Sequence, residues 1–194
     1  GNNLKLTSGA SSKNAALSIE RDNHHLVSSH KGCPINDIFI SENNSWLLLA
    51  GIPFIDGNNH AENLNLQPIL NNLEDFINKR VDGHFCCLAY NNQSKTFYVA
   101  SDCNSFIPVF YSRHGDLLIF SSNLEDLCHK VRPSISSDSF ARVIQLGCPL
   151  PGETQFNGVY RLEANQLFKI STELKIDKKY YWKPSDEKEW NLSL

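Results

Sequence analysis

"VDGHFCCLAYNNQSKTFYVASDCNSFIPVFYSRHGDLLIFSSNLEDL", residues 81–127, places several apolar runs in close succession. Two polar turn sequences, Asn91-Asn92 and His114-Gly115-Asp116, interrupt them, which is typical of antiparallel strands. The runs are apolar at almost every position rather than at every second one, so both faces of the sheet should be covered. Strands are therefore predicted at residues 81–90, 96–100, 107–111 and 117–120.

A helix is predicted just before this stretch, because apolar residues recur there with helical spacing. Asn65 is a suitable N-cap, and Pro68 falls in the first turn, where proline is tolerated. One face of about three turns would carry Leu66, Ile69, Leu70, Leu73, Phe76 and Ile77.

Two shorter helices are predicted after the apolar runs. Ser122 and Glu125 have the spacing of a capping box, which would open the first helix and carry it through Cys128. Ser137 or Asp138 would open the second, and Gly147 would end it.

Further strand signals lie near both ends of the chain. Four runs separated by turn formers predict an antiparallel meander at residues 16–19, 25–27, 37–40 and 46–49. Two later runs, at 158–162 and 166–170, predict a hairpin. The predicted elements come in the order strands, helix, strands, helices and strands, and the sheets should be covered on both faces. This combination predicts a layered α+β domain.

The domain is expected to span residues 1–182. Residues 183–194 show no apolar period, so we interpret them as a linker toward a further domain. The aromatic cluster Tyr180, Tyr181 and Trp182 would pack this end of the domain against such a partner.

Composition excludes several classes of function. The formal net charge of -3, with scattered Lys and Arg, gives no basic stripe that could follow a phosphate backbone. No apolar run approaches the roughly 18 residues of a membrane span, and the first thirty residues lack the apolar centre of a signal peptide. We therefore expect a cytoplasmic protein whose six cysteines are mostly small buried hydrophobes.

The histidines do not predict a metal site. His24 and His25 are adjacent, so on a strand their rings would point to opposite faces. The other histidines have no partner at ligand spacing. Asp82 with Asp102, or Ser101-Asp102, could suggest hydrolytic chemistry, but the sequence offers no oriented His to complete such a centre.

Residues 81–127 resemble class II glutamine amidotransferases of the asparagine synthetase type. In that family a Gly-Phe strand and a polar hairpin lead to an Arg-Asp strand end, a Gly-x-x-Pro-Leu-Tyr-Tyr strand and a Phe-Ala-Ser-Glu strand. Ser101 replaces the family's Arg, and Asn123 replaces its Glu. The matching positions are Gly83, Phe85, Asp102, Pro108, Tyr111, Phe120, Ser121 and Ser122.

Two later segments extend the resemblance to about residues 36–183. "ETQFNGVYRLEANQLFKIS" is similar to the family's Thr-x-Phe-x-Gly segment, with Thr154, Phe156, Gly158 and Leu162 in place. "KKYYW" is similar to the Tyr-Trp pair that closes the glutaminase domain.

The resemblance implies a fold and a setting. The fold would be a four-layer αββα sandwich of two mainly antiparallel sheets, as in N-terminal-nucleophile hydrolases. Asparagine synthetase, β-lactam synthetase and lasso-peptide cyclases join such a domain to an ATP-pyrophosphatase-like domain that adenylates a carboxylate. The expected partner is thus a C-terminal synthetase domain or subunit that would use ATP and Mg²⁺, or a second copy of the chain in a homodimer. This domain itself has no phosphate loop and no expected cofactor.

The resemblance also implies a degenerate glutaminase site. Glutamine hydrolysis in that family needs an N-terminal Cys that supplies both the thiolate and the accepting α-amine. This chain begins Gly1-Asn2-Asn3, so both groups are missing unless that start is artificial. Exposure of Cys33 by processing is disfavoured, because it lies only 18 residues before Gly51.

The family's oxyanion turn, Asn-Gly-Glu, matches Ala50-Gly51-Ile52 here. Gly51 is retained, but Ala50 has no side-chain donor for an oxyanion. The family's substrate-gripping carboxylate has no clear counterpart near Asn63-Leu64-Asn65, although Glu62 is close, and Arg21 is the one early candidate for its Arg.

We therefore expect no catalytic residue for glutamine hydrolysis and a vestigial pocket formed by Ala50, Gly51, Ile52, Asp82 and Asp102. The domain would serve as a scaffold or as a substrate-docking module of an amide-forming ligase. Two alternatives remain open: a stand-alone binding or regulatory protein that uses the emptied pocket, and an active amidotransferase whose true N-terminal Cys is missing from this chain.

Overall fold

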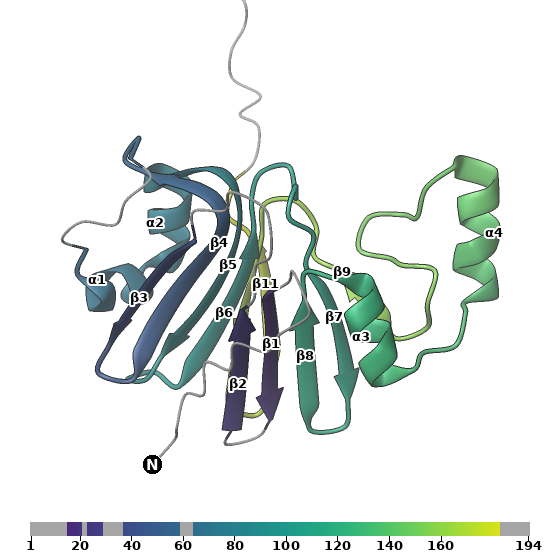
Figure 1. Cartoon of the computed structure of the whole chain (residues 1–194), viewed down its shortest axis with the longest axis horizontal. Coiled ribbons are helices and arrows are strands. Elements are labelled where there is room, and N and C mark those ends of the chain that lie inside the picture. The colour runs from purple at the N-terminus through teal and green to yellow at the C-terminus, as the bar shows by residue number, and fades with distance from the viewer. Residues whose placement is uncertain (1–14, 21–22, 29–36, 59–63, 183–194) are drawn as a thin grey trace, which may run out of the picture.

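Two antiparallel sheets form the centre of the molecule (Figure 1). The computed structural model describes residues 15–20 and 23–28 by their backbone, and residues 37–58 and 64–182 in full. The five-stranded sheet has the order β2-β1-β8-β7-β9, with β1 (Ala15–Glu20), β2 (Asn23–Ser28), β7 (Phe110–His114), β8 (Leu117–Ser121) and β9 (Val159–Arg161). The six-stranded sheet has the order β11-β10-β6-β5-β4-β3, with β3 (Ile38–Glu42), β4 (Ser45–Ile55), β5 (Val81–Asn91), β6 (Thr96–Ser101), β10 (Gln166–Ile170) and β11 (Ile176–Tyr180).

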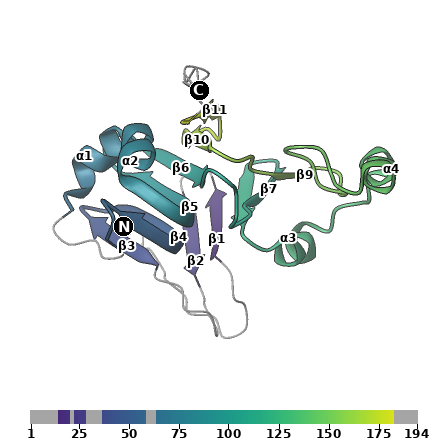
Figure 2. The ribbon, with the colours of Figure 1, turned by 90° about the horizontal axis from the view of Figure 1, so that it is seen from above.

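Helices cover the outer faces of both sheets (Figure 2). Helices α1 (Leu66–Asn71) and α2 (Leu73–Arg80) pack on the six-stranded sheet, and α3 (Leu124–Val131) packs on the five-stranded one. Between the sheets lies a third cluster, with Trp46, Leu88 and Phe168 from one sheet and Leu118 and Phe120 from the other. The predicted α+β architecture of two antiparallel sheets in four layers is confirmed.

Burial explains why the central strands are apolar throughout. Every residue of β6 is buried, as are the last seven residues of β5, because one face meets α1 and α2 while the other meets the second sheet. Helix α4 (Ser137–Leu146) differs, since Ser139 is its one buried residue and the ribbon shows it standing away from both sheets (Figures 1 and 2).

The distribution of strands between the sheets differs from the prediction. The four N-terminal runs form two hairpins in different sheets, β1–β2 in one and β3–β4 in the other, so the single predicted meander is wrong. The predicted C-terminal hairpin is also wrong, because β9 pairs with β7 whereas β10 pairs with β6 and β11. Strand β7 begins three residues later than predicted, after Pro108.

Several helix boundaries also differ from the prediction. The predicted helix over 66–77 is broken at Asn72 (φ −138°, ψ 57°), and the Asn65 side chain makes no capping hydrogen bond. Asn123, rather than Ser122, caps α3 by accepting hydrogen bonds from the N–H groups of Glu125 and Asp126. Ser136 caps α4, and Gly147 ends it in the left-handed conformation as predicted.

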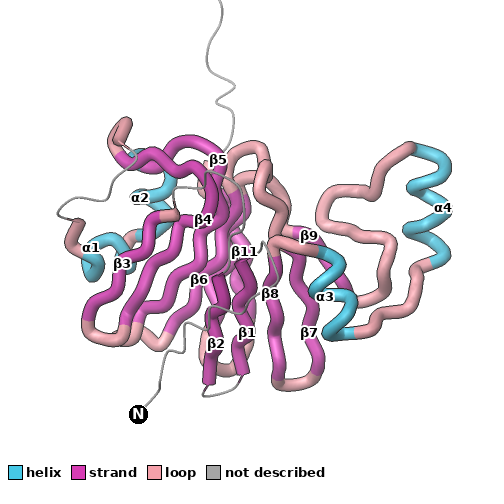
Figure 3. Tube along the Cα trace, in the orientation of Figure 1, coloured by secondary structure: helices cyan, strands magenta, loops and turns pink. Residues whose placement is uncertain are grey.

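In the ranges that the structure describes, the longest helix is α4 with ten residues, and no helix is long and apolar enough to cross a membrane. The turns β3–β4, β5–β6 and β7–β8 lie together at one end of the strands, at the bottom of Figure 3. Because β4 runs away from that end, the Ala50-Gly51-Ile52 sequence lies toward the opposite end of the sandwich.

Candidate functional site

Gly51 occupies a backbone position that only glycine fits without strain. Its φ is +129°, and a Cβ added there would lie 2.3 Å from the carbonyl oxygen of His84 and 2.2 Å from Cδ1 of Ile107. The close approach arises because Gly51 pairs with Phe85 in the β4–β5 ladder while the loop before β7 lays Ile107 over it. Glycine is thus required by geometry at this position, whatever chemistry the turn performs.

The Gly51 N–H already has an internal acceptor. It donates to Oδ1 of Asp37 over 2.8 Å, from the residue just before β3. Asp37 was not a predicted site residue, and no sequence signal pointed to it, since it lies 14 residues before Gly51 and the contact depends on β3–β4 pairing.

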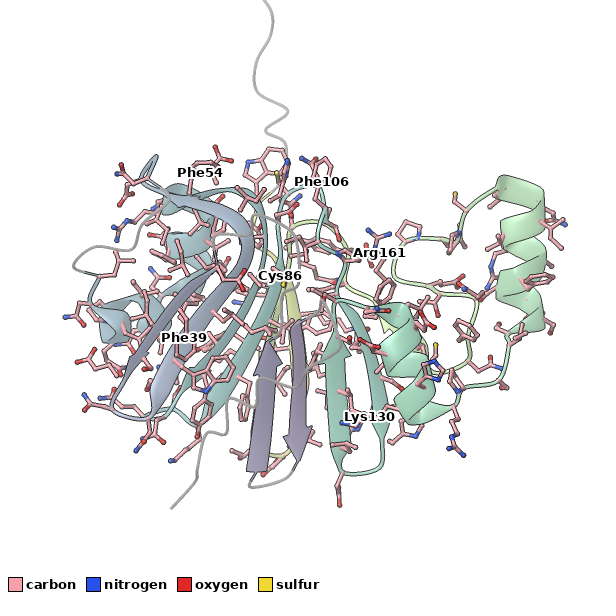
Figure 4. All side chains as sticks on the ribbon, in the orientation of Figure 1. Phe39, Phe54, Cys86, Phe106, Lys130 and Arg161 are labelled. Carbon is pink, nitrogen blue, oxygen red and sulfur yellow. The ribbon has the colours of Figure 1, made fainter. Side chains whose placement is uncertain are left out.

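The residues on either side of Gly51 differ in burial. Ala50 is 3% exposed and belongs to the core between the sheets, whereas Ile52 lies further along β4 and is exposed. Phe54 and Phe106 are also exposed, and both lie at the same end of the molecule (Figure 4). The ring of Phe106 lies 3.9 Å from that of His84, the residue that pairs with Ile52, centroid to centroid.

Asp102 serves as an internal cap of the loop that follows β6. Its side chain is fully buried, with Oδ2 accepting from Phe85 N–H over 3.0 Å. Oδ1 accepts from Asn104 N–H over 2.7 Å and from Phe106 N–H over 3.3 Å. The Asp102 carboxylate therefore accepts hydrogen bonds from three backbone N–H groups.

Asp82 pairs with Phe54, two positions from Ile52 along the β4–β5 ladder. Its Oδ1 accepts from the adjacent Gly83 N–H, and its side chain is exposed. It lines a cleft of about 520 Å³ on the helix side of the six-stranded sheet, together with Arg80, Cys103, Asn165 and Trp182. At the rim of this cleft Arg80 Nη2 pairs with Asp56 Oδ2 over 2.6 Å, and the hydrogen bond from Arg80 lowers the pKa of the Asp56 carboxyl.

A family profile described as a glutamine amidotransferase domain matches residues 68–182. This match covers more than half of the 194-residue chain. The chain belongs to the glutamine amidotransferase domain family. The match begins after β4, so the Ala50-Gly51-Ile52 turn lies outside it.

Two of the solved structures to which this chain is similar are the following. Glutamine phosphoribosylpyrophosphate amidotransferase from B. subtilis has 12% identity and a TM-score of 0.43, with 88% of this chain and 43% of that chain covered. A structure described as the allosteric regulatory enzyme of purine biosynthesis has 12% identity and a TM-score of 0.41, with 75% of this chain and 30% of the other covered. The chain therefore spans less than half the length of either protein. Comparison with curated protein sequences gives no match.

The structure brings together part of the expected pocket of this amidotransferase domain. Gly51 and Asp102 meet through the backbone of Phe85, which pairs with Gly51 and exchanges hydrogen bonds with Asp102. Ala50 and Ile52 lie beside them on β4, and neither of them lines the cleft that Asp82 borders. Arg21, Cys33 and Glu62, and the predicted linker at 183–194, lie outside the described residues.

The described cysteines of the central sheet are buried rather than poised for attack. Cys86 faces the core between the sheets, and Cys87 faces the helices. Burial, with a contribution from the Asp37 and Asp102 carboxylates, raises the pKa of the Cys86 thiol to about 12. Burial also raises the pKa of Cys87. Neither thiol has the lowered pKa of a reactive nucleophile.

Ser101 and Tyr181 connect the end of β6 to the end of the domain. Ser101 Oγ donates to the backbone oxygen of Glu163, and the Tyr181 hydroxyl donates to the backbone oxygen of Ser101 over 2.6 Å. Tyr181 thus packs inside this domain, while Tyr180 and Trp182 remain about half exposed. Among the described residues no group of three or more His, Cys, Asp and Glu side chains could hold a metal ion.

Proposed function

We propose that this chain is a degenerate glutaminase-like domain of an asparagine synthetase-related ligase. The domain would not hydrolyse glutamine, and would serve as a scaffold or a substrate-docking module. The ligase would activate a carboxylate with ATP and Mg²⁺ in a separate synthetase domain or subunit, then pass it to free ammonia or to an amine. Soluble operation in the cytoplasm, as the chain's composition suggests, belongs to the same proposal.

The hydrogen bond from Gly51 N–H to Asp37 carries the proposal. An oxyanion hole needs donors that are free to meet the negative charge that develops on the substrate oxygen. Here a carboxylate oxygen holds the backbone donor and would repel a developing oxyanion at the same place. Loss of one such donor reduces kcat by about a hundredfold to a thousandfold in a working hydrolase.

The residue at position 50 supports the same reading. An oxyanion turn of the asparagine synthetase type would use a side-chain amide there, whereas Ala50 is apolar and buried between the sheets. Cys86, the nearest cysteine to this turn across the ladder, faces the core with a raised pKa. Next to Gly51, Cys86 is therefore poorly suited to supply a thiolate, and Ala50 has no side-chain donor for an oxyanion.

Glutamate release by the full-length natural protein tests the proposal most directly. With glutamine and ATP present, we expect glutamate to form no faster than in buffer without the protein. Calorimetry should show no glutamine binding tighter than millimolar. With ammonia or a primary amine in place of glutamine, the protein should convert ATP to AMP and pyrophosphate in the presence of a suitable carboxylate. Glutamine-dependent glutamate release would overturn the loss of glutaminase activity.

The coding sequence beyond Leu194 tests the ligase assignment separately. A Ser-Gly-Gly-x-Asp-Ser pyrophosphatase loop downstream would support the ATP-dependent ligase. A stop codon directly after Leu194, with no synthetase subunit co-purifying, would instead support a stand-alone binding protein. A Met-Cys start in the natural transcript would support an active amidotransferase.

A binding role without chemistry is the second candidate, and the exposed apolar group near Gly51 favours it. Ile52, Phe54 and Phe106 are all exposed at this end of the sandwich, and Phe106 is 60% exposed. Exposed apolar side chains gathered in one place often mark a binding surface. Replacing Phe106 with Ser should abolish ligand binding if the emptied pocket is used in this way, and should leave binding unchanged if it is not.

A further inference from the structure

A second cleft opens between the two sheets, at the edge formed by β9, β10 and β11. Its volume is about 530 Å³, within the usual range for small-molecule sites. Side chains from both sheets line it, among them Tyr111, Arg113, Tyr160, Arg161, Glu163 and Lys178. None of these residues belongs to the vestigial turn around Gly51. Figure 4 labels one of them, Arg161, beside β9.

The charges that line this cleft are predominantly positive. Three cations contribute, Arg113, Arg161 and Lys178, and none of them forms an ion pair with a carboxylate among the described residues. Their hydrogen bonds go to uncharged acceptors, the backbone oxygens of Gly115, Leu174 and Ser105 and the hydroxyl of Tyr111.

The two acidic side chains of the cleft do not balance this charge. Glu153 pairs with Arg142 of α4, which is a cation from outside the lining residues. Glu163 accepts a hydrogen bond from the Tyr180 hydroxyl over 2.8 Å and remains the single uncompensated carboxylate. Three cations therefore face one uncompensated anion, which leaves a positive field in a partly enclosed space.

Lys178 is held in place but retains donor capacity. Its Nζ donates to the Tyr111 hydroxyl over 3.0 Å and lies 4.9 Å from the centre of the Phe168 ring and 5.5 Å from that of Tyr111. These contacts between a cation and aromatic rings fix the ammonium group where it reaches the cleft. An ammonium group has three N–H donors, and Tyr111 accepts from one of them.

An aromatic wall stands beside these cations. The Tyr160 ring lies 5.4 Å from that of Tyr111, and Tyr160 is 46% exposed. The Tyr160 ring thus has a free surface in the cleft on which a flat group could stack.

We propose that this cleft binds a small oxyanion, a carboxylate or phosphate group, that is attached to a flat ring. Lys178 and Arg113 would hold the anion, and Tyr160 would stack against the ring. The site is independent of the proposed loss of glutaminase activity, because it uses none of the residues around Gly51.

Titration of the 194-residue chain with phenyl phosphate at constant ionic strength tests the proposal, followed by calorimetry and by backbone amide shifts in NMR spectra. We expect submillimolar binding that shifts the amides of β9 and β11. Methyl phosphate, which lacks the ring, and benzylammonium, which reverses the charge, should each bind at least tenfold more weakly. Benzoate reports whether a carboxylate serves as well as a phosphate.

Two variants on β11 distinguish binding in this cleft from attraction of the anion by the general charge of the surface. Lys178→Met keeps the aliphatic stem and removes the charge, and should weaken phenyl phosphate binding about tenfold, as expected for loss of a hydrogen bond to a charged group. Lys179→Met is the matched control, since Lys179 is the next residue and pairs with Glu74 of α2 on the other face. Equal affinity of both variants, or binding of benzylammonium as tight as that of phenyl phosphate by the unaltered chain, would overturn the proposal.

Discussion

Gly51 is required at its position by backbone geometry alone. Its positive φ and its contact with the His84 carbonyl oxygen arise from the β4–β5 pairing, not from any ligand. The sequence pointed to this glycine and to the absence of a side-chain donor at Ala50. It could not reveal Asp37, because a carboxylate's partner depends on strand pairing rather than on local spacing.

Replacing Gly51 with Ala should destabilise the fold by about 2 to 4 kcal/mol, since the new Cβ meets backbone and the φ is strained. Gly57→Ala is the matched control, because Gly57 also has a positive φ but no atom within 4 Å of an added Cβ. In that control the free energy of unfolding should fall by about 1 kcal/mol, from backbone strain alone. Urea unfolding measures the free energy of unfolding of both variants, and an equal decrease in the two would contradict the close approach at Gly51.

Asp102→Asn should lower the free energy of unfolding by about 2 to 3 kcal/mol, because a buried N–H would lose its acceptor. Whichever way the new amide turns, its NH2 group faces the N–H of either Phe85 or Asn104. Asp177→Asn on the exposed strand β11 should change the unfolding free energy by less than about 0.5 kcal/mol. If the two variants unfold at the same urea concentration, the Asp102 carboxylate is not the loop's acceptor.

The raised pKa of Cys86 predicts that the protein loses stability at alkaline pH. Its pKa is raised from a usual value of 9.0 to about 12 in the folded state, so its contribution is complete below about pH 9 and declines as the pH rises from there toward 12. Each such thiol lowers the unfolding free energy by about 1.4 kcal/mol per pH unit in that window. Unfolding of the parent chain and Cys86→Ala at about pH 8, 9 and 10 should give a shallower decline for the variant. Parallel declines would show that this thiol already ionises in the folded protein.

Local sequence patterns predicted most elements but not all of their limits. The strands between residues 81 and 121 were found because apolar runs and turn formers alternate there. Pro108 delays the start of β7, and the Asn71-Asn72 pair divides α1 from α2, with Asn71 Oδ1 accepting from Gln67 and Asn91 instead of serving the helix. Asn123 displaced Ser122 as the cap of α3, a choice between adjacent capping residues that spacing cannot make.

Helix α4 should open far more readily than α2. Leu73, Phe76 and Ile77 bury one face of α2, whereas Phe140 and Ile144 of α4 are exposed. Hydrogen exchange should therefore be fast across α4 and close to the global unfolding rate across α2. Ser136→Ala, which removes the α4 cap, should speed exchange in α4 and leave α2 unchanged. Equal protection of the two helices would mean that α4 is packed against the body of the domain.

The two sheets are built from interleaved parts of the chain. The first two strands enter the five-stranded sheet, the next four the six-stranded one, then three return and the last two go back again. Hydrophobic patterning predicted strands with both faces covered, but it does not say which sheet receives each strand. That is why the predicted meander and C-terminal hairpin failed while the layered α+β class held.

This interleaving predicts that the domain folds as one unit. A chain ended at residue 165 lacks β10 and β11 and with them the buried Phe168, so both the six-stranded sheet and the core between the sheets lose part of their packing. We expect this variant to show no cooperative unfolding transition, whereas a chain ended at Trp182 should retain one. Circular dichroism during heating distinguishes them, and a cooperative transition in the shorter chain would contradict the prediction.

The pairing of β1 with β8 also affects how the protein is made. Ala16 pairs with Ser121, so a ribosome must add about a hundred residues between the two partners. At bacterial or eukaryotic rates of synthesis that interval is on the order of ten seconds. Throughout it the β1–β2 hairpin has one edge without its native neighbour, which makes the nascent chain a target for chaperones that shield strand edges.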